Sequence, residues 1–468
     1  MTDYGKVSDS LISLLEKELG ADLVFFDEDI LDAYSRDQTK GLEARPDLVI
    51  KPRNVSQIQR VVQIANEKKI PITPRGQGYG LSGGAVPLYG GIVISLERMN
   101  KVIDLDLDNL MAVVEQGIIT GNFHRLVEEE GLFYPPDPAS LDSCSIGGNI
   151  AEGAGGPYAV KYGTTKDYVC GLEVVLPSGE IIETGGKVVK DATGYSLTQF
   201  FVGSEGTLGI ITKAILRLLP LPGKRIDLLV AFDKVEDASR TVSMLLKRRV
   251  IPTAVELMDN SALKLGEEYL KEKPPFPDAQ AHLLFALNGN DEKSLEEEME
   301  TIEQCCDENN AADVLVAKGT ASRERLWKFR RCLFEAAGER SLLCRSMDPV
   351  VPRAKIPALL AEIKKISEKE GFEASCFGHA GDGNIHITMF PGSLSEEEWL
   401  KRYSVFCREI YVKTSELGGR IAAEHGIGAI RKDYLPISIK KAELNLLKEI
   451  KKAFDSKNIM NPGKIFDM

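Results

Sequence analysis

Three of the chain's five histidines lie in two short, polar, glycine-rich segments. The first segment is Gly378-His379-Ala380-Gly381-Asp382-Gly383-Asn384-Ile385-His386, and the second is Glu424-His425-Gly426-Ile427-Gly428. Two imidazoles and a carboxylate form a good ligand set for zinc, iron(II) or manganese, and a further histidine beside such an ion can move a proton. We therefore expect the chemistry of this chain to depend on these two segments.

The spacing of His379 and His386 restricts how they can share one ion. Residues seven apart on an extended strand lie about 23 Å from each other, at roughly 3.3 Å per residue. The chain between them must therefore fold back, and the three glycines between residues 378 and 383 give the backbone the freedom to do so. Residues 386–390 are predicted to form a strand. The other interpretation is a turn-capping histidine and a core histidine, but functional residues concentrate in polar loops, which favours the metal site.

Glycine-rich segments in the first half of the chain indicate a ligand of another kind. Residues 75–84 follow a strand-like stretch, so their amides can cradle a pyrophosphate. The segment lacks a GKS or GKT ending and a clean strand–GxGxxG–helix unit, and taken alone it is equally consistent with a tight loop. Two more such segments, at 145–156 and 203–211, fit a ligand as long as a flavin dinucleotide lying extended against the backbone.

The length, charge and cysteines of the chain limit its class. A chain of 468 residues is too long for one ordinary core, so two domains are expected. The formal net charge of −12 argues against binding of nucleic acid or anionic lipid. Because no apolar run approaches the roughly 18 residues of a membrane-spanning helix, and the acidic N-terminus does not look like a signal peptide, we expect a cytoplasmic protein without direct membrane insertion. The eight cysteines include no CxxC pair, which argues against an iron–sulfur cluster in this chain.

Hydrophobic periodicity and composition divide the chain into segments. Residues 1–44 are predicted to form a helical lead-in, and short strands and helices follow from about residue 45, which is typical of an α+β fold. Pro220, Pro222 and Gly223 mark a domain boundary near residue 221, where glycine-dense sequence gives way to charged helical sequence. Beyond it, a strand at 281–287 and a helix at 294–305 suggest a sheet covered by helices on one side.

The ordered combination of these motifs resembles a known family. The chain contains, in this order, PRGxGxGLSGG, PPDPxS, GGNxAExAGG, KYG, GSEGTLGIIT, GHAGDGNxH, EHGIG and NIMNPGK. From about residue 45 to the C-terminus it closely resembles the FAD-linked oxidases of the vanillyl-alcohol oxidase type, in the branch of the glycolate oxidase flavin subunit and D-lactate dehydrogenase. The resemblance implies a two-lobed α+β FAD-binding domain at 45–220 and an α+β cap domain at 221–415, with an antiparallel sheet covered by helices. Residues 416–468 would return to the FAD domain.

The resemblance also implies where FAD binds. The implied cofactor-binding residues are Arg75, Gly76, Gln77, Gly78, Tyr79, Gly80, Ser82, Gly83, Pro138, Ser140, Ser145, Gly148, Ala154, Gly155, Glu205, Ile210 and Asn461, with Glu205 and Ile210 near the adenine end. Relatives that bind flavin covalently offer a His or Cys near the ring, whereas Gly84-Ala85 offers neither, so noncovalent FAD is expected. Tyr79 and Gly153 depart from the Thr and Asn that are usual in the family.

The resemblance assigns roles to the polar residues of the cap and C-terminal segments. It places the metal ligands at His379, His386 and Glu424 and the catalytic base at His425. Arg330 matches the family's carboxylate-binding arginine, although it could also be a surface helix residue. Arg345 replaces an expected tyrosine-like residue, and its role is left open.

The implied reaction is oxidation of a D-2-hydroxy acid by hydride transfer to flavin N5, assisted by a divalent ion. D-lactate and glycolate are the foremost substrates, and 2-hydroxyglutarate is open. The alternatives are a metal-free flavin alcohol or phenol oxidase and a flavin electron-transfer subunit without its own substrate. Electrons would pass to a partner protein, either an iron–sulfur subunit or an electron-transferring flavoprotein.

Overall fold

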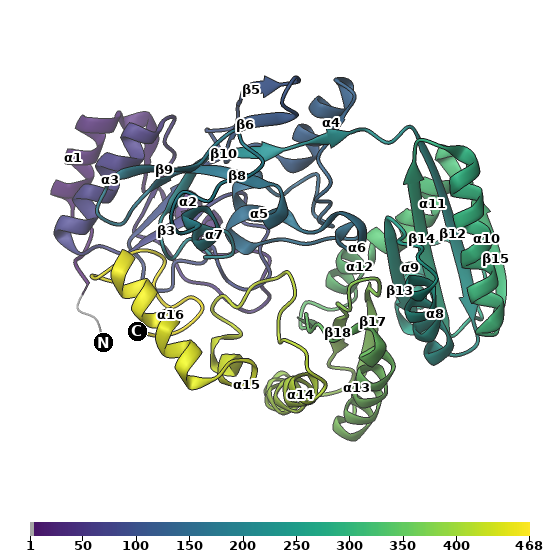
Figure 1. The fold of residues 1–468 in the computed structure, drawn as a ribbon. Helices are drawn as coiled ribbons and strands as arrows, with labels where there is room; N and C mark the ends of the chain where they lie inside the picture. Colours follow the sequence, from purple (N-terminus) through teal and green to yellow (C-terminus); the bar gives the residue numbers. More distant parts are fainter. Residues whose placement is uncertain (1–3) are drawn as a thin grey trace. The chain divides into compact units, whose positions relative to one another are not determined.

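The computed structural model describes residues 4–468, which form two compact units (Figure 1). The first unit contains residues 4–154, 164–221 and 424–468, and the second contains residues 155–163 and 222–423. The first three residues of the predicted lead-in lie outside the described residues. Each unit has sheets and helices of its own and is described separately.

A four-stranded sheet in the order β1-β2-β4-β3 forms one part of the first unit. The strands β2 (Leu48–Ile50), β4 (Ile92–Ser95) and β3 (Ile72–Arg75) are parallel, and β1 (Val24–Phe25) pairs antiparallel with β2. The predicted lead-in is thus not wholly helical. Besides α1 (Asp9–Leu19) and α2 (Glu28–Ala33) it supplies β1, because the short apolar stretch Val24–Phe25 completes the edge of this sheet.

The helix α3 (Val55–Lys68) covers this parallel sheet. Its apolar residues recur at helical spacing, so one face of the helix is buried with the strands. The shared core includes Leu11, Leu15, Leu48, Ile50, Ile58, Val61, Val62, Ile92 and Ile94. This core fixes β3, whose last residue, Arg75, begins the glycine-rich segment 75–84.

The second sheet of the first unit has five antiparallel strands in the order β5-β6-β10-β8-β9. Their bounds are β5 Val102–Asp106, β6 Met111–Glu115, β8 Val169–Val175, β9 Ile181–Gly185 and β10 Ile210–Arg217. A two-stranded ribbon of β7 (Leu132–Phe133) and β11 (Leu219–Pro220) and the helices α4 (Thr120–Glu129), α5 (Ile146–Glu152) and α7 (Leu197–Phe201) accompany it. The two sheets give this unit two lobes.

The C-terminal segment is anchored on the first sheet. Beyond α15 (Leu435–Ser438) and α16 (Lys441–Phe454), the chain runs parallel to β3, where Ile72 N–H donates to Ile459 O and Asn461 N–H donates to Ile72 O, both at 2.7 Å. Lys451 is 3% exposed, and its Nζ donates to Thr207 O, Met460 O and Asp455 Oδ2 at 2.6–2.7 Å. One buried ammonium thus joins α16 to two other segments.

The second unit contains a seven-stranded antiparallel sheet in the order β15-β12-β14-β13-β17-β18-β16. The strands are β12 Lys224–Phe232, β13 Ala254–Asp259, β14 Ala281–Gly289, β15 Ala311–Ala317, β16 Arg345–Met347, β17 Glu373–His379 and β18 His386–Phe390. The predicted strands at 281–287 and 386–390 are confirmed as β14 and β18. The two histidine-bearing strands are therefore neighbours inside this sheet.

Seven longer helices accompany the sheet of the second unit. They are α8 Val235–Lys247, α9 Asn260–Leu270, α10 Glu292–Glu308, α11 Thr320–Arg331, α12 Leu333–Arg340, α13 Ile356–Glu370 and α14 Glu396–Glu416. The predicted helix at 294–305 is confirmed within α10, which starts earlier because the Asp291 side chain caps it by accepting the Ser294 N–H at 3.0 Å. Two groups of helices pack on the sheet, α8 with α10 and α13, and α9 with α11 and α12.

Residues 155–163 belong to the second unit, although they follow the first unit's α5 in sequence. Their short helix α6 (Ala159–Tyr162) is tied to β14, because Lys161 Nζ and Tyr162 OH both donate to Asn288 Oδ1, at 2.9 and 2.8 Å. Tyr158 OH accepts from Arg225 at 2.7 Å. These polar contacts explain why a short stretch of the predicted FAD-binding domain packs with the cap strands.

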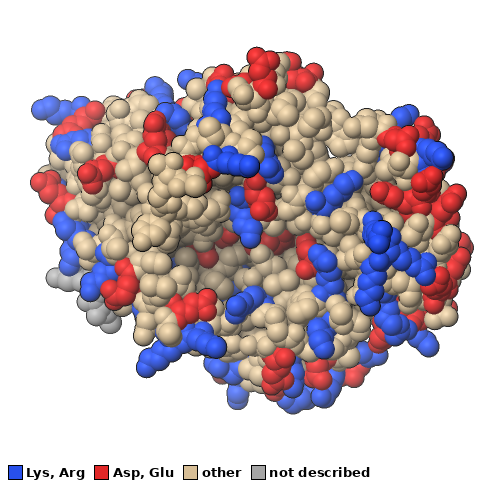
Figure 2. Space-filling model, viewed as in Figure 1, with Lys and Arg blue, Asp and Glu red and all other residues tan. Residues whose placement is uncertain are grey.

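The surface charge and the character of the helices can be compared with the expectations from the sequence. Basic and acidic side chains are interspersed over both units on the face that Figure 2 shows. Within residues 4–468, no helix combines the length and apolar character needed to cross a membrane.

Removal of the Lys451 ammonium should destabilise the first unit. Lys451→Met leaves the Asp455 carboxylate buried without its cation, so the free energy of unfolding should fall by about 3 kcal/mol or more. Chemical denaturation followed by circular dichroism measures this loss. The neighbouring exposed Lys452 is the control, because Lys452→Met should change the same free energy by no more than about 0.5 kcal/mol. Equal losses in the two variants would contradict the anchoring role.

Candidate functional site

A β-hairpin brings His379 and His386 together. The strands β17 and β18 pair antiparallel, with Phe377 opposite His386, so the chain folds back over residues 380–385 as predicted. The Nε2 atoms of the two histidines lie 3.4 Å apart, and their rings are nearly perpendicular. Two imidazoles that bind one tetrahedral zinc at about 2.0–2.1 Å have their nitrogens roughly 3.3 Å apart. The pair therefore has the spacing of metal ligands.

The tip of this hairpin depends on one glycine and one asparagine. Gly383 has φ +98°, and a Cβ there would lie 2.0 Å from Val351 O, so only glycine fits. The neighbouring Asn384 donates from Nδ2 to Asp348 Oδ1 at 2.7 Å. The predicted polar turn is thus held against Asp348, which directly follows β16.

The buried carboxylate of Glu256 links the predicted metal site to the predicted substrate site. Glu256 lies on β13 with no exposed surface, and its Oε1 is 2.7 Å from His379 Nδ1. Its Oε2 accepts from Arg330 Nε at 2.6 Å. Burial alone would raise the pKa of Glu256, but its interactions with His379 and Arg330 lower it below its ordinary value. With Nδ1 of His379 bonded to Glu256, Nε2 is the nitrogen that can bind an ion.

Arg330 is not the surface residue that one interpretation of the sequence suggested. It is 5% exposed, and its guanidinium lies 5.0 Å from the centre of the Phe377 ring. Glu256 engages Nε, and among the described residues no hydrogen bond engages Nη1 or Nη2. The outer edge of the guanidinium can therefore form a bidentate contact with a carboxylate.

Glu424 and His425 follow a segment that is bonded to Asp348. The Ala423 N–H donates to Asp348 O at 2.9 Å and to Asp348 Oδ2 at 3.0 Å, and residues 424 and 425 come next in the chain. Within the second unit, Asp348 Oδ1 lies 3.4 Å from His386 Nδ1. Within the first unit, Glu424 Oε1 lies 3.6 Å from His425 Nε2. The donor set of imidazoles and carboxylates fits a divalent ion.

Asp348 and Glu256 are buried carboxylates that contact predicted site residues, and the sequence analysis did not single them out as site residues. Glu256 lies within the largely apolar strand β13, whereas Asp348 follows the short strand β16, and both are fully buried. A carboxylate in an otherwise apolar strand is costly to bury without a partner, so this pattern was the available signal.

The other singled-out residues of the second unit have structural surroundings. Arg345 donates from Nη1 to the carbonyls of Leu343 and Cys344, at 3.3 and 3.1 Å, and so stabilises its own turn. His282 Nε2 lies 3.2 Å from Phe276 O, and burial lowers the pKa of His282 to about 4.

The glycine-rich segment after β3 folds around Arg75. Arg75 Nη1 donates to Arg36 O at 2.8 Å, and the guanidinium lies over the Tyr34 ring. Gly78 has φ +74°, and a Cβ there would lie 2.1 Å from Arg75 Nη2. In the predicted loop, the backbone at residue 78 thus lies very close to the buried Arg75 side chain. This close approach requires glycine at position 78.

Two of the predicted FAD-binding segments lie directly against each other. A Cβ at Gly76 would lie 2.4 Å from Ser145 Oγ and 3.5 Å from Gly148 N. Ser145 is the N-cap of α5, and its Oγ accepts the Gly148 N–H at 3.3 Å. Backbone N–H groups from both segments therefore meet where no side chain intervenes, which suits an extended pyrophosphate.

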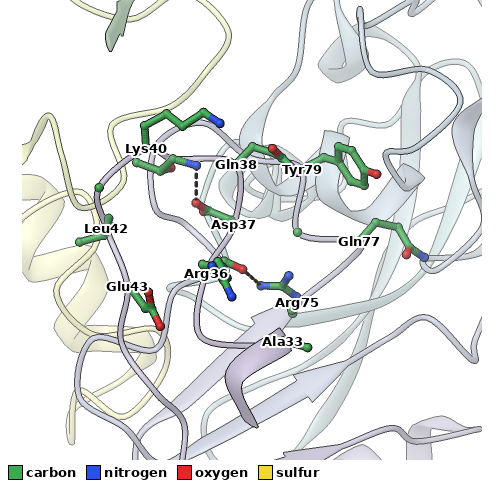
Figure 3. A pocket seen from close by; sticks show the side chains of 13 residues that line it. Ala33, Arg36, Asp37, Gln38, Lys40, Leu42, Glu43, Arg75, Gln77 and Tyr79 are labelled. Carbon is green, nitrogen blue, oxygen red and sulfur yellow. Dashed lines mark hydrogen bonds between the residues drawn. The ribbon is translucent and has the colours of Figure 1, made fainter. Parts of the chain in front are cut away.

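A hollow of about 670 Å³ lies beside this loop. Figure 3 shows the side chains that line it. Its lining comprises Ala33, Arg36, Asp37, Gln38, Thr39, Lys40, Gly41, Leu42, Glu43, Arg75, Gln77, Gly78 and Tyr79. Residues 36–43 were assigned to the lead-in and not to the site. They join the loop because Gln38 N–H donates to Gly80 O at 3.1 Å.

Several other predicted FAD-binding residues occupy defined positions in the first unit. Asn461 Nδ2 donates to Gly84 O at 2.9 Å and to Glu205 O at 2.7 Å, so it joins the C-terminal segment to the glycine-rich loop. Ile210 is fully buried in the core of the parallel sheet, where its side chain contributes to packing. Pro138 and Ser140 lie between β7 and α5, Ala154 ends one stretch of the first unit, and Gly155 begins one stretch of the second.

An unsatisfied amide supports a polar ligand next to these loops. Gln116 is completely buried after β6, and among the described residues neither its Oε1 nor its Nε2 has a hydrogen-bond partner. A Cβ at Gly147, beside the Ser145 cap, would lie 2.8 Å from Gln116 Oε1. Buried amides normally bond to something, so this residue and the glycine cradle fit a cofactor with polar edges such as FAD.

Comparison with known proteins identifies both units. Residues 46–185 match a family model described as an FAD binding domain, and residues 221–465 match the C-terminal domain of FAD linked oxidases. The glycolate oxidase subunit GlcD of Bacillus subtilis (strain 168) is 42% identical over 433 residues, which cover 92% of this chain and 92% of that protein. The D-lactate dehydrogenase of Anaerostipes hadrus is 37% identical over 469 residues, covering 99% and 98%.

A solved structure of p-cresol methylhydroxylase with bound substrate has the same fold. It superposes with a TM-score of 0.79 at 22% identity, covering 97% of this chain and 96% of that one. The likeness confirms the predicted α+β fold of the vanillyl-alcohol oxidase type.

Gly78→Ala should weaken FAD binding. The added methyl group meets Arg75, and alanine is strained at this positive φ, so the loop must shift. We expect the purified variant to retain less than half of the wild-type flavin absorbance per chain. Gly186→Ala is the control, because nothing lies within 4 Å of its added Cβ, and it should retain full absorbance. Full flavin content in Gly78→Ala would show that the loop does not hold the cofactor.

Proposed function

We propose that this chain, which belongs to the family of FAD-linked oxidases, oxidises the hydroxyl group of a D-2-hydroxy acid and yields the 2-oxo acid. It is an FAD-dependent 2-hydroxy-acid dehydrogenase. D-lactate and glycolate are the substrates we favour, because the relatives reported above carry those names. The observation that carries the proposal is the single buried carboxylate of Glu256, which holds an imidazole and a guanidinium at once.

Arg330 would bind the substrate carboxylate. Its Nε is fixed by Glu256 and its plane by Phe377, so the outer edge is pre-oriented for a planar anion. A fixed arginine loses little side-chain freedom on binding, which favours a defined orientation of the acid.

His379, His386 and Glu424 would hold a zinc, iron(II) or manganese ion, and Asp348 would support them. An ion bound there would lower the pKa of the substrate hydroxyl, and bound FAD would accept the hydride from the substrate carbon. His425 would accept the proton from the hydroxyl oxygen, and Glu424, whose Oε1 lies 3.6 Å from His425 Nε2, stands beside it in the chain.

FAD would be held without a covalent bond. The glycine-rich segment 75–84, the start of α5, Asn461 and Gln116 offer backbone and amide groups to it. Neither Gly84 nor Ala85 offers a side chain that could form a bond to the flavin.

The electron acceptor would be another protein, either an iron–sulfur subunit or an electron-transferring flavoprotein. The Bacillus subtilis relative is named as a subunit, which supports a partner. The eight cysteines lack the spacing of a cluster-binding motif, so the cluster of such a partner would not come from this chain.

Anaerobic reduction of the flavin tests the proposal. The purified FAD-loaded protein is mixed with D-lactate, glycolate or D-2-hydroxyglutarate without oxygen, and the flavin absorbance should be bleached by at least one of them. Treatment with a chelator should abolish the bleaching, and return of a divalent ion should restore it.

The L enantiomer of lactate is the control for stereochemistry and should bleach the flavin much more slowly. Persistent flavin absorbance with every 2-hydroxy acid would contradict the activity. If complete removal of the metal leaves the bleaching unchanged, the proposed oxidation stands, but the metal-assisted step is contradicted.

A further inference from the structure

A pair of buried carboxyl groups lies behind the backbone that follows His425. Glu205 and Glu152 belong to the first unit; Glu205 is buried, and Glu152 is half-buried with its Oε2 atom shielded from solvent. A Cβ at Gly426 would lie 2.1 Å from Glu152 Oε2 and 2.9 Å from Glu205 Oε1. The two acids therefore converge on the residue directly after the proposed base.

Glu205 holds this backbone with both of its oxygens. Oε1 accepts the Ile427 N–H and Oε2 accepts the Gly428 N–H, each at 2.7 Å. Glu205 itself adopts φ +51°, a conformation that a non-glycine residue adopts only when its surroundings enforce it. Its own N–H donates to Ala151 O at 2.8 Å, and its carbonyl accepts from Asn461. The backbone of Glu205 and its carboxylate are thus both held by hydrogen bonds.

The same backbone is locked to the glycine-rich loop of the flavin site. Ala429 N–H donates to Ser82 O at 2.8 Å, and a Cβ at Gly428 would lie 2.0 Å from that oxygen. Arg431 donates from Nη1 to Gly426 O at 3.0 Å. The three peptide groups after His425 are therefore held from the Glu205 side and from the Ser82 side.

The two acids have different roles. Burial, together with the charge of Glu205 beside it, raises the pKa of Glu152 well above its ordinary value and so disfavours its charged form. Burial also raises the pKa of Glu205, but its two N–H donors oppose the shift and stabilise the carboxylate. Of the two acids, Glu205 is the one that accepts the backbone N–H groups of residues 427 and 428.

We propose that Glu205 is a positioning residue for His425, and that it acts by fixing the peptide groups of residues 427 and 428. This inference rests on the proposed function, because it assigns His425 as the base. The family resemblance implies a position for Glu205 near the adenine end of FAD, whereas in the structure each of its carboxylate oxygens accepts one of these N–H groups.

Glu205→Gln tests the proposal. The variant replaces one acceptor oxygen with an amide NH₂ that faces an N–H donor, so the segment should loosen while the fold is retained. We expect anaerobic flavin reduction by the best 2-hydroxy acid to slow by about tenfold or more, with bound FAD and KM unchanged. Hydrogen exchange of the peptide that spans residues 426–430 should accelerate by about tenfold or more, from the same loss.

Glu173→Gln is the matched control. Glu173 is also a buried carboxylate of the first unit, with Thr212 and Lys213 bonded to it at 2.7 Å each, but it does not contact residues 426–430. This variant should leave the reduction rate and the exchange of that peptide as in the wild type. Glu205→Asp, which keeps the charge but is shorter by one methylene group, should fall between Glu205→Gln and the wild type in both measurements.

The outcomes separate this inference from the proposed function. Wild-type reduction rate in Glu205→Gln, with or without faster exchange, would overturn the positioning role and leave the activity intact. If none of the acids reduces the flavin of the wild type, the proposed function fails. In that case hydrogen exchange still tests the contact of Glu205 with residues 427 and 428, and an unchanged exchange rate in Glu205→Gln would overturn it. If Glu205→Gln does not fold, the wild type decides: slow exchange at Ile427 and Gly428 supports the contact and rapid exchange overturns it.

Discussion

One buried carboxylate, that of Glu256, is the interaction on which the second unit's site depends. A carboxylate without solvent is costly unless it is paired and hydrogen-bonded, and here both oxygens are used. Both partners of Glu256 belong to the candidate site. One is His379, a proposed metal ligand, and the other is Arg330, the residue proposed for the substrate carboxylate. The position of either partner is therefore set by the same strand, β13.

In the first unit, the main constraint is that backbone groups must stay accessible and closely packed. Its glycines are required where Gly78 meets Arg75 and where Gly428 meets Ser82 O. These close approaches connect the flavin-binding loop to the segment that carries His425. Their consequence is that the loop and the base belong to one packed structure, so a change in one affects the other.

The sequence predicted local elements of the candidate site, but not the buried groups that contact them from distant parts of the chain. The histidine-rich hairpin, the strands β14 and β18 and the cradle of glycines follow from local patterns and turn chemistry, and they are found in the structure. Glu256, Asp348 and Gln116 were not predicted, because each becomes meaningful only through partners far away in the chain. Glu256 is separated from His379 by 123 residues, and only the pairing of β13 with β17 brings them together. The lead-in was predicted as helix because short strands such as β1 have too few residues for a period to be recognised.

The most direct test of the account is the affinity of Glu256→Gln for a divalent ion. The metal-free protein and the variant are titrated with Zn²⁺ in competition with a chromogenic chelator, and KM for the best 2-hydroxy acid is measured on the same samples. If Glu256 orients both partners, the dissociation constant for Zn²⁺ should rise by about ten- to hundredfold and KM should rise with it. Unchanged Zn²⁺ affinity and unchanged KM in a folded, FAD-loaded variant would contradict the account.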